Sequence, residues 1–156
     1  MFTHPQYKLP QVRISKSEAY SWFFTQAPCY WHGKVDLVIR DIRFEDLQPA
    51  NTLKHWDVLA RWTRQIACRR RIPPIIVSKT KFGTYYIHDG NHRCEAIRIC
   101  YRGALKRLHF PVAVLEPRPG YRFEPVSFAT HWTHMLVPER ITPDLSGRAV
   151  VAEIAM

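Results

Sequence analysis

The sequence lacks the features of several common protein classes. Its four cysteines include no Cys-x-x-Cys pair, so we expect a reduced, cytoplasmic setting. No apolar run approaches the ~20 residues that span a membrane, and the N-terminus has no apolar segment of the kind found in signal peptides. No Walker A motif is present, which excludes a P-loop NTPase. Repeats and low-complexity tracts are absent too.

Acidic residues are scarce relative to basic ones. The chain has 13 Asp and Glu against 23 Lys and Arg, a formal net charge of +10 and a pI of about 9.8. Such a charge attracts polyanions, with nucleic acid the first candidate and acidic membrane surfaces the second, although a merely soluble basic protein has the same composition. An apolar content of 46% excludes wholesale disorder and is enough for one core domain.

The stretch 85–96 predicts a strand, a tight turn and a helix. Apolar and aromatic residues lead up to Ile87, as in a buried strand. Gly90 permits a backbone geometry that residues with a Cβ avoid. No Gly or Pro interrupts residues 91–102, and Gly103 can end the helix.

A helix that begins in this way is a candidate anion site. Its first N–H groups and the positive end of its dipole favour a negative ligand. His92 and Arg93 add donors in the first turn, and a guanidinium can hold a phosphate through two N–H groups. Asp89 can hold a metal ion, orient Arg93 or accept a proton. The alternative is that Asp89 caps the helix and pairs with Arg93, without further function.

Residues 90–96 resemble the phosphate-binding box of the ParB/sulfiredoxin superfamily. ParB proteins carry Gly-Glu-Arg-Arg-x-x-Ala there, sulfiredoxins carry Gly-Cys-His-Arg, and ParB-like free-serine kinases carry Asp-Gly-x-His-Arg. Asp89, Gly90, His92 and Arg93 match the last form. The flanking segments, 74–77 (Pro-Ile-Ile-Val) and 110–115 (Phe-Pro-Val-Ala-Val-Leu), are similar to the strands before and after the family's box.

The resemblance spans residues 35–116 and implies a mixed α+β fold, a small mixed sheet with flanking helices. It places an N-terminal extension at 1–34 and a C-terminal extension at 117–156. It also implies that ATP or another NTP binds with Mg²⁺. In that interpretation the phosphate-binding residues are Gly90, Asn91, His92 and Arg93.

The resemblance further implies NTP hydrolysis or phosphoryl transfer, coupled to DNA binding or cleavage. Asp89 would hold the metal or orient a reacting group, and His92 would act beside it. Because the serine kinases use an acidic residue from their N-terminal region as a base, Glu45 or Asp46 is a catalytic candidate by position. Two solvated loop carboxylates are the alternative. A metal-dependent nuclease would need Asp89 together with one of these two carboxylates.

The chain also departs from the family. The catalytic cysteine of sulfiredoxins aligns with Asn91, so sulfinic-acid reduction is not expected. The Glu-Arg pair of ParB aligns with Asn91 and His92, and its upstream Gln-Pro-Arg becomes Gln48, Pro49 and Ala50. CTP-driven clamp closure is therefore not expected.

A second helix is predicted from Asn51 or Thr52. The residues that give its apolar face are Trp56, Leu59, Ala60, Trp62, Ile66 and Ala67. The helix ends in Arg69, Arg70 and Arg71, which with Arg64 form the candidate nucleic-acid patch. The alternative is a solvated basic helix end, since cations there are favourable in any case.

Two other functions remain open at this point. One is a non-catalytic DNA- or protein-binding module that keeps the nucleotide pocket, and the other is a small-molecule kinase. Prolines after residue 116 predict an irregular connection. His131 and His134, expected on a helix, can share a metal with His88 and His92 if the fold brings them together. A peripheral tail is expected from Pro138 onward.

Overall fold

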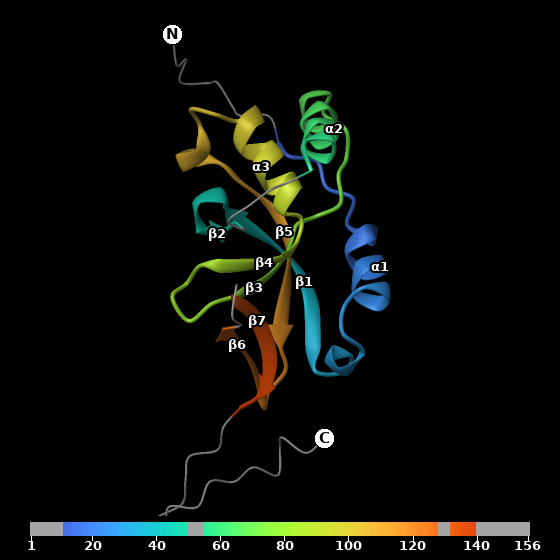
Figure 1. Ribbon diagram of the computed structural model, residues 1–156, viewed down its shortest axis with the longest axis vertical. Coiled ribbons are helices and arrows are strands. Elements are labelled where there is room, and N and C mark those ends of the chain that lie inside the picture. The colour runs from blue at the N-terminus through green and yellow to red at the C-terminus, as the bar shows by residue number, and fades with distance from the viewer. Residues whose placement is uncertain (1–10, 50–54, 128–131, 140–156) are drawn as a thin grey trace, which may run out of the picture.

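The computed structural model describes residues 11–49, 55–127 and 132–139, and shows the predicted mixed α+β class (Figure 1). The helices are α1 (Ser17–Thr25), α2 (Trp56–Ala67) and α3 (Asn91–Cys100), with short 3₁₀ turns η1 (Cys29–Trp31), η2 (Phe44–Asp46) and η3 (Leu105–Arg107). The strands are β1 (Val35–Arg43), β2 (Leu47–Gln48), β3 (Ile76–Lys79), β4 (Tyr85–Asp89), β5 (His109–Pro117), β6 (Tyr121–Ser127) and β7 (Trp132–Pro138). Within these ranges no helix combines the length and the apolar character needed to cross a membrane.

The main sheet is mixed, with the strand order β1-β5-β3-β4-β2. Strand β1 pairs antiparallel with β5 along its whole length, and β3 pairs parallel with β5 and antiparallel with β4. Because β3 lies in the middle of the sheet and is covered on both faces, consecutive side chains of this strand are buried rather than alternate ones. Ile76, Val77 and Ser78 are accordingly all buried.

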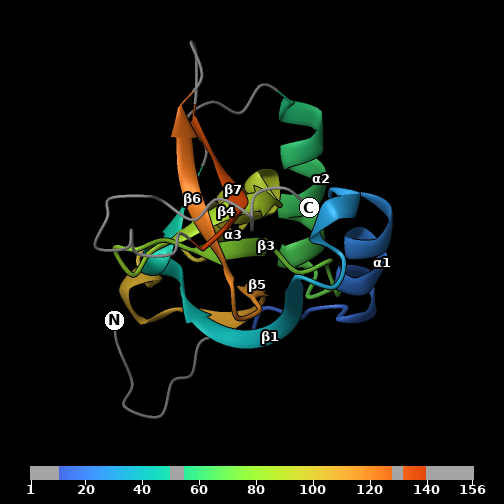
Figure 2. The ribbon, with the colours of Figure 1, turned by 90° about the horizontal axis from the view of Figure 1, so that it is seen from below.

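Side chains of β5 point alternately to the two faces of the sheet, and each face has its own core. Val112 and Val114 join the core beneath α2 and α3. Ala113 and Leu115 join the opposite core, which includes Phe23 of α1. Figure 1 shows α2 above α1 on one flank of the molecule, and Figure 2 looks along that flank from below. The sheet therefore carries the helices that matter for the site on one face and α1 with the β6–β7 hairpin on the other.

Several elements predicted within the first 116 residues are confirmed. The strand predicted from Val35 is β1, and the strand, turn and helix of the box are β4, Gly90 and α3.

Helix α2 is present, but its predicted start at Asn51 or Thr52 lies outside the described residues. The prediction that Trp56 belongs to the buried face is wrong, because its side chain is 71% exposed. The buried residues of α2 are Leu59 and Ile66.

The prediction for the segment after Pro117 is wrong. Instead of an irregular connection, β6 and β7 form an antiparallel hairpin. Pro125 is tolerated in β6 because that strand pairs with β7 on one side and leaves its other edge unpaired within the described residues. His134 lies in β7 rather than on a helix, and His131 and the predicted tail beyond Glu139 lie outside the described residues. Buried Leu136 anchors the hairpin to the core.

Candidate functional site

The turn between β4 and α3 has a geometry that demands glycine. Gly90 is the N-cap of α3 with φ 108° and ψ 22°, and its carbonyl accepts the first helical hydrogen bond from the Cys94 N–H at 2.8 Å. A Cβ at this position would lie 2.9 Å from Nη2 of Arg93 and 3.2 Å from Cα of Ile75. No side chain caps the helix. The first N–H groups of α3 therefore have no acceptor within the helix.

Arg93 is held by the protein itself. Its side chain is buried, and Nη2 donates to the Pro74 carbonyl at 3.1 Å and to Oδ2 of Asp89 at 3.2 Å. Its Cζ lies 5.4 Å from the centroid of the Trp62 ring. Arg93 thus pairs with Asp89, which was the alternative interpretation of the sequence. Its other contacts connect the turn to α2 and to the segment before β3. The sequence predicted that the Arg93 guanidinium holds a phosphate through two N–H groups. These contacts instead direct Nη2 of Arg93 to other parts of the protein.

The amino ends of α2 and α3 meet beside this turn. The ring centroids of His55, the N-cap of α2, and His92 are 5.7 Å apart. Further along, Sγ of Cys100 donates to the Thr63 carbonyl at 3.5 Å. His55 precedes Thr63 by the same number of residues as His92 precedes Cys100, so the two helices run in the same direction. The positive ends of both helix dipoles therefore point to one place.

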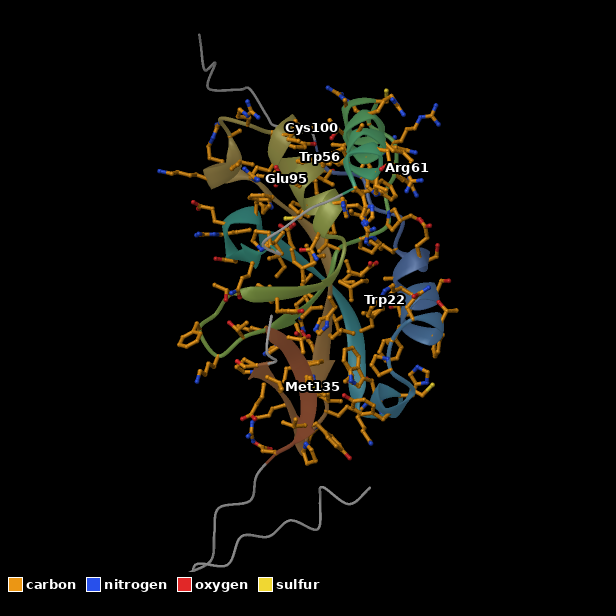
Figure 3. All side chains as sticks on the ribbon, viewed as in Figure 1. Trp22, Trp56, Arg61, Glu95, Cys100 and Met135 are labelled. Atoms are coloured by element: carbon orange, nitrogen blue, oxygen red, sulfur yellow. The ribbon has the colours of Figure 1, made fainter. Side chains whose placement is uncertain are left out.

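Two features of this place were not predicted from the sequence. Nε2 of His92 is buried and has no hydrogen-bond partner in the described structure, although a buried ring nitrogen normally has one. Trp56 is exposed directly beside His55. Figure 3 shows Trp56 on the side of α2 nearest α3, whereas Arg61 extends from the outer side. The sequence indicated His92 as a candidate because it lies in the first turn of a predicted helix. No sequence pattern indicated that His55 or Trp56 would lie near His92.

The acidic candidates do not come together. Glu45 and Asp46 lie in η2 and form ion pairs with Arg43 at 3.3 and 3.7 Å. Strand β2, which follows them, pairs with the beginning of β4, whereas Asp89 is the last residue of β4. Four residues of strand separate these points by ~13 Å. The predicted two-carboxylate nuclease centre is therefore not formed, and no group of three metal-ligating side chains occurs among the described residues.

His88, one residue before Asp89, belongs to a separate buried network. Oγ of Ser78 lies 2.7 Å from Nε2 of His88 and 2.5 Å from Nδ1 of His134. Burial, reinforced by the nearby His134, lowers the pKa of His88 to about 3, and burial lowers the pKa of His134 to about 4. Both imidazoles are thus neutral at pH 7, and they join β7 to β3 and β4 through one hydroxyl.

The predicted arginine patch is divided. Arg64 and Arg70 line one cavity, and Arg71 lines another. Arg69 lines neither of them and has φ 57°, a left-handed conformation that is rare for a residue with a side chain. The three consecutive arginines therefore do not form one surface.

Comparisons of the chain with protein-family models, with curated proteins and with solved structures find no match. The resemblance of the box to the ParB/sulfiredoxin superfamily therefore stays a prediction.

Proposed function

We propose that the protein binds a nucleoside triphosphate with its phosphates at the joined amino ends of α2 and α3. The observation that carries this proposal is the 5.7 Å contact between His55 and His92. It brings two helix dipoles and two imidazoles to one point, next to an uncapped helix start. An anion there would receive backbone N–H groups and the unpartnered Nε2 of His92.

Asp89 fits the role of a magnesium ligand in this site. Its Oδ2 pairs with Arg93, yet its side chain remains 43% exposed. Mg²⁺ in nucleotide sites is commonly held by one or two carboxylates together with phosphate oxygens, and it neutralises phosphate charge when bound. Phosphoryl transfer requires positioning and charge neutralisation above all. We therefore include NTP hydrolysis or phosphoryl transfer in the proposal, with Asp89 and His92 beside the reacting phosphate.

DNA is the proposed partner of this activity. The formal net charge of +10 and the arginines lining cavities beyond α2 support it. DNA binding is favoured over cleavage, since the described carboxylates do not form a two-carboxylate centre. The Asp-Gly-x-His-Arg form of the box also occurs in small-molecule kinases. Binding of a small substrate does not require a net charge as large as that of this protein. A non-catalytic module would bind the nucleotide without turnover.

Binding and turnover of ATP, CTP and GTP, each with Mg²⁺, test the proposal. Because Arg93 is buried, its replacement would disturb the fold, so His55→Ala and His92→Gln are the better probes. Each should weaken binding about tenfold, the effect of losing a contact to a charged ligand. His109→Ala, an exposed histidine in β5, is the matched control and should bind as the wild type does. Absence of binding to every nucleotide would contradict the proposal.

A further inference from the structure

The end of α2 turns sharply, and this turn sends neighbouring arginines in different directions. The Arg69 N–H donates to the Ile66 carbonyl at 2.9 Å, and the Arg70 N–H reaches back to the Gln65 carbonyl at 3.0 Å. Arg69 takes up the left-handed conformation that such a helix end requires. We call Arg70 and Arg71 the ridge, because Arg70 lines one cavity and the adjacent Arg71 lines another.

The first cavity, of about 290 Å³, lies against the outer side of α2. Its lining residues are Arg61, Arg64, Gln65, Cys68 and Arg70. Three of these five side chains carry a positive charge and none carries a negative one. The positive charge around this cavity favours an anionic ligand.

The second cavity, of about 590 Å³, lies between the ridge and the start of α1. Residues 11–17, Arg71 and Pro111 line it. Its cations come from Arg13, Lys16 and Arg71, its hydroxyl groups from Ser15 and Ser17, and it too contains no carboxylate.

Backbone pairing fixes the position of the second cavity beside the ridge. Ile14 forms a bridge with Ile72, the Ser15 N–H donates to the Ile72 carbonyl at 2.8 Å, and the Ile72 N–H donates to the Arg13 carbonyl at 2.9 Å. Figure 1 shows this N-terminal segment running from the region of α2 to α1. The two cavities therefore lie next to each other, because adjacent residues line them.

The cations of both cavities differ in what they contact. Cζ of Arg61 lies 5.0 Å from the centroid of the Trp62 ring. Within the described part of the chain the ion pairs involve other arginines, and the lining cations Lys16, Arg61, Arg64, Arg70 and Arg71 have no carboxylate partner. Arg13 is held through Nη1 by the Arg69 carbonyl at 3.2 Å. Such an excess of unpaired charge on both sides of a ridge suits a chain of regularly repeated phosphates better than one small anion.

We infer that the backbone of a DNA strand crosses the ridge of Arg70 and Arg71 and places phosphates in both cavities. The inference deepens the proposed function and rests on its DNA-binding part. It assigns Arg13, Lys16 and Arg61 to DNA binding, and it removes Arg69 from the patch expected from the sequence.

Arg69 provides a matched control, since it is adjacent to the ridge and carries the same charge. Its replacement by glycine suits the left-handed conformation. The bond from Arg13 goes to the carbonyl of residue 69 and is kept in that variant. Arg69→Gly thus removes one positive charge without altering either cavity.

Binding of oligothymidylates of increasing length, measured by fluorescence anisotropy over a range of salt concentrations, tests the inference. A duplex of the same length forms a second arm. Arg70→Ala and Arg71→Ala should each reduce the slope of log affinity against log salt by ~0.7 for single strands or ~0.9 for a duplex. Each should also abolish the gain in affinity that appears when an oligonucleotide becomes long enough to reach both cavities. Arg69→Gly should keep the slope and the gain.

Equal loss of slope in all three variants would overturn the inference, because general attraction would then explain binding. Affinity independent of length would overturn it as well. ATP binding by the same proteins separates the two proposals. If ATP binds but DNA does not, the inference and the DNA part of the proposed function fail while the nucleotide site stands. If DNA binds as described but ATP does not, the nucleotide site fails and the inference stands.

Discussion

His55 and His92 lie with their ring centroids 5.7 Å apart, at the amino ends of two helices that are distant in the sequence and adjacent in space. Nε2 of His92 is buried without a partner among the described residues. A buried nitrogen in that state is unfavourable unless water or a ligand completes its hydrogen bonding. This relationship is the basis of the proposed phosphate site.

The stability of the protein should fall as the pH drops below 6.5. His88 and His134 have pKa values of about 3 and about 4 in the folded protein, against ~6.5 in the unfolded chain. Below pH 6.5 the unfolded chain therefore binds protons that the folded protein does not. Each histidine should lower the free energy of unfolding by ~2 kcal/mol between pH 7 and pH 5. Urea unfolding at a series of pH values measures this loss.

Variants test whether the loss of stability at low pH comes from the histidines that contact Ser78. His134→Leu removes one titrating group and should reduce the pH-dependent loss by about half. His109→Ala, at an exposed position, should keep the full loss. A free energy of unfolding that does not change between pH 7 and pH 5 would contradict the neutral state of the buried histidines.

Replacement of Arg93 should destabilise the fold. Arg93→Ala leaves the Pro74 carbonyl without its donor and removes the cation from Trp62, with an expected loss of ~2–3 kcal/mol. Arg98→Ala breaks an exposed pair with Glu95 on the same helix and should change the stability by less than ~0.5 kcal/mol. Chemical denaturation compares the two variants. Equal losses of stability in the two variants would show that the buried contacts of Arg93 do not stabilise the fold.

Gly90→Ala and Gly33→Ala should differ in their effects on stability. Both glycines have positive φ, at 108° and 81°, so each alanine has a backbone cost of ~1–2 kcal/mol. At Gly33 the added Cβ meets nothing within 4 Å, whereas at Gly90 it meets Arg93 and Ile75. Gly90→Ala should therefore be less stable than Gly33→Ala by ~1–3 kcal/mol. A thermal unfolding comparison showing no difference would rule out the close packing of the turn.

Much of the fold follows from local sequence signals. Gly90 between an apolar run and an uninterrupted helical stretch was enough to predict β4, the turn and α3. The hairpin of β6 and β7 was missed because Pro117, Pro119 and Pro125 outweighed the strand-forming residues around them. A proline on an unpaired strand edge loses no hydrogen bond, and whether a strand has such an edge is decided by the tertiary fold.

The site was predicted less completely than the fold. Residue types predicted an anion site at the start of α3, but the burial of Arg93 depends on Pro74 and Trp62, which approach it only in the folded chain. The partnership of His55 with His92 likewise depends on how α2 packs against α3. Arg69, Arg70 and Arg71 looked equivalent in sequence, and the left-handed residue at the helix end makes them different.

The most direct test of the phosphate site is a titration of ¹⁵N-labelled protein with ATP and Mg²⁺, followed through its backbone amide resonances. We expect the largest shifts at Asn91, His92 and Arg93 and at His55, and we expect His55→Ala to require more ATP for the same shifts. Shifts confined to the arginines beyond α2, or no shift at the start of α3, would contradict the proposed phosphate site.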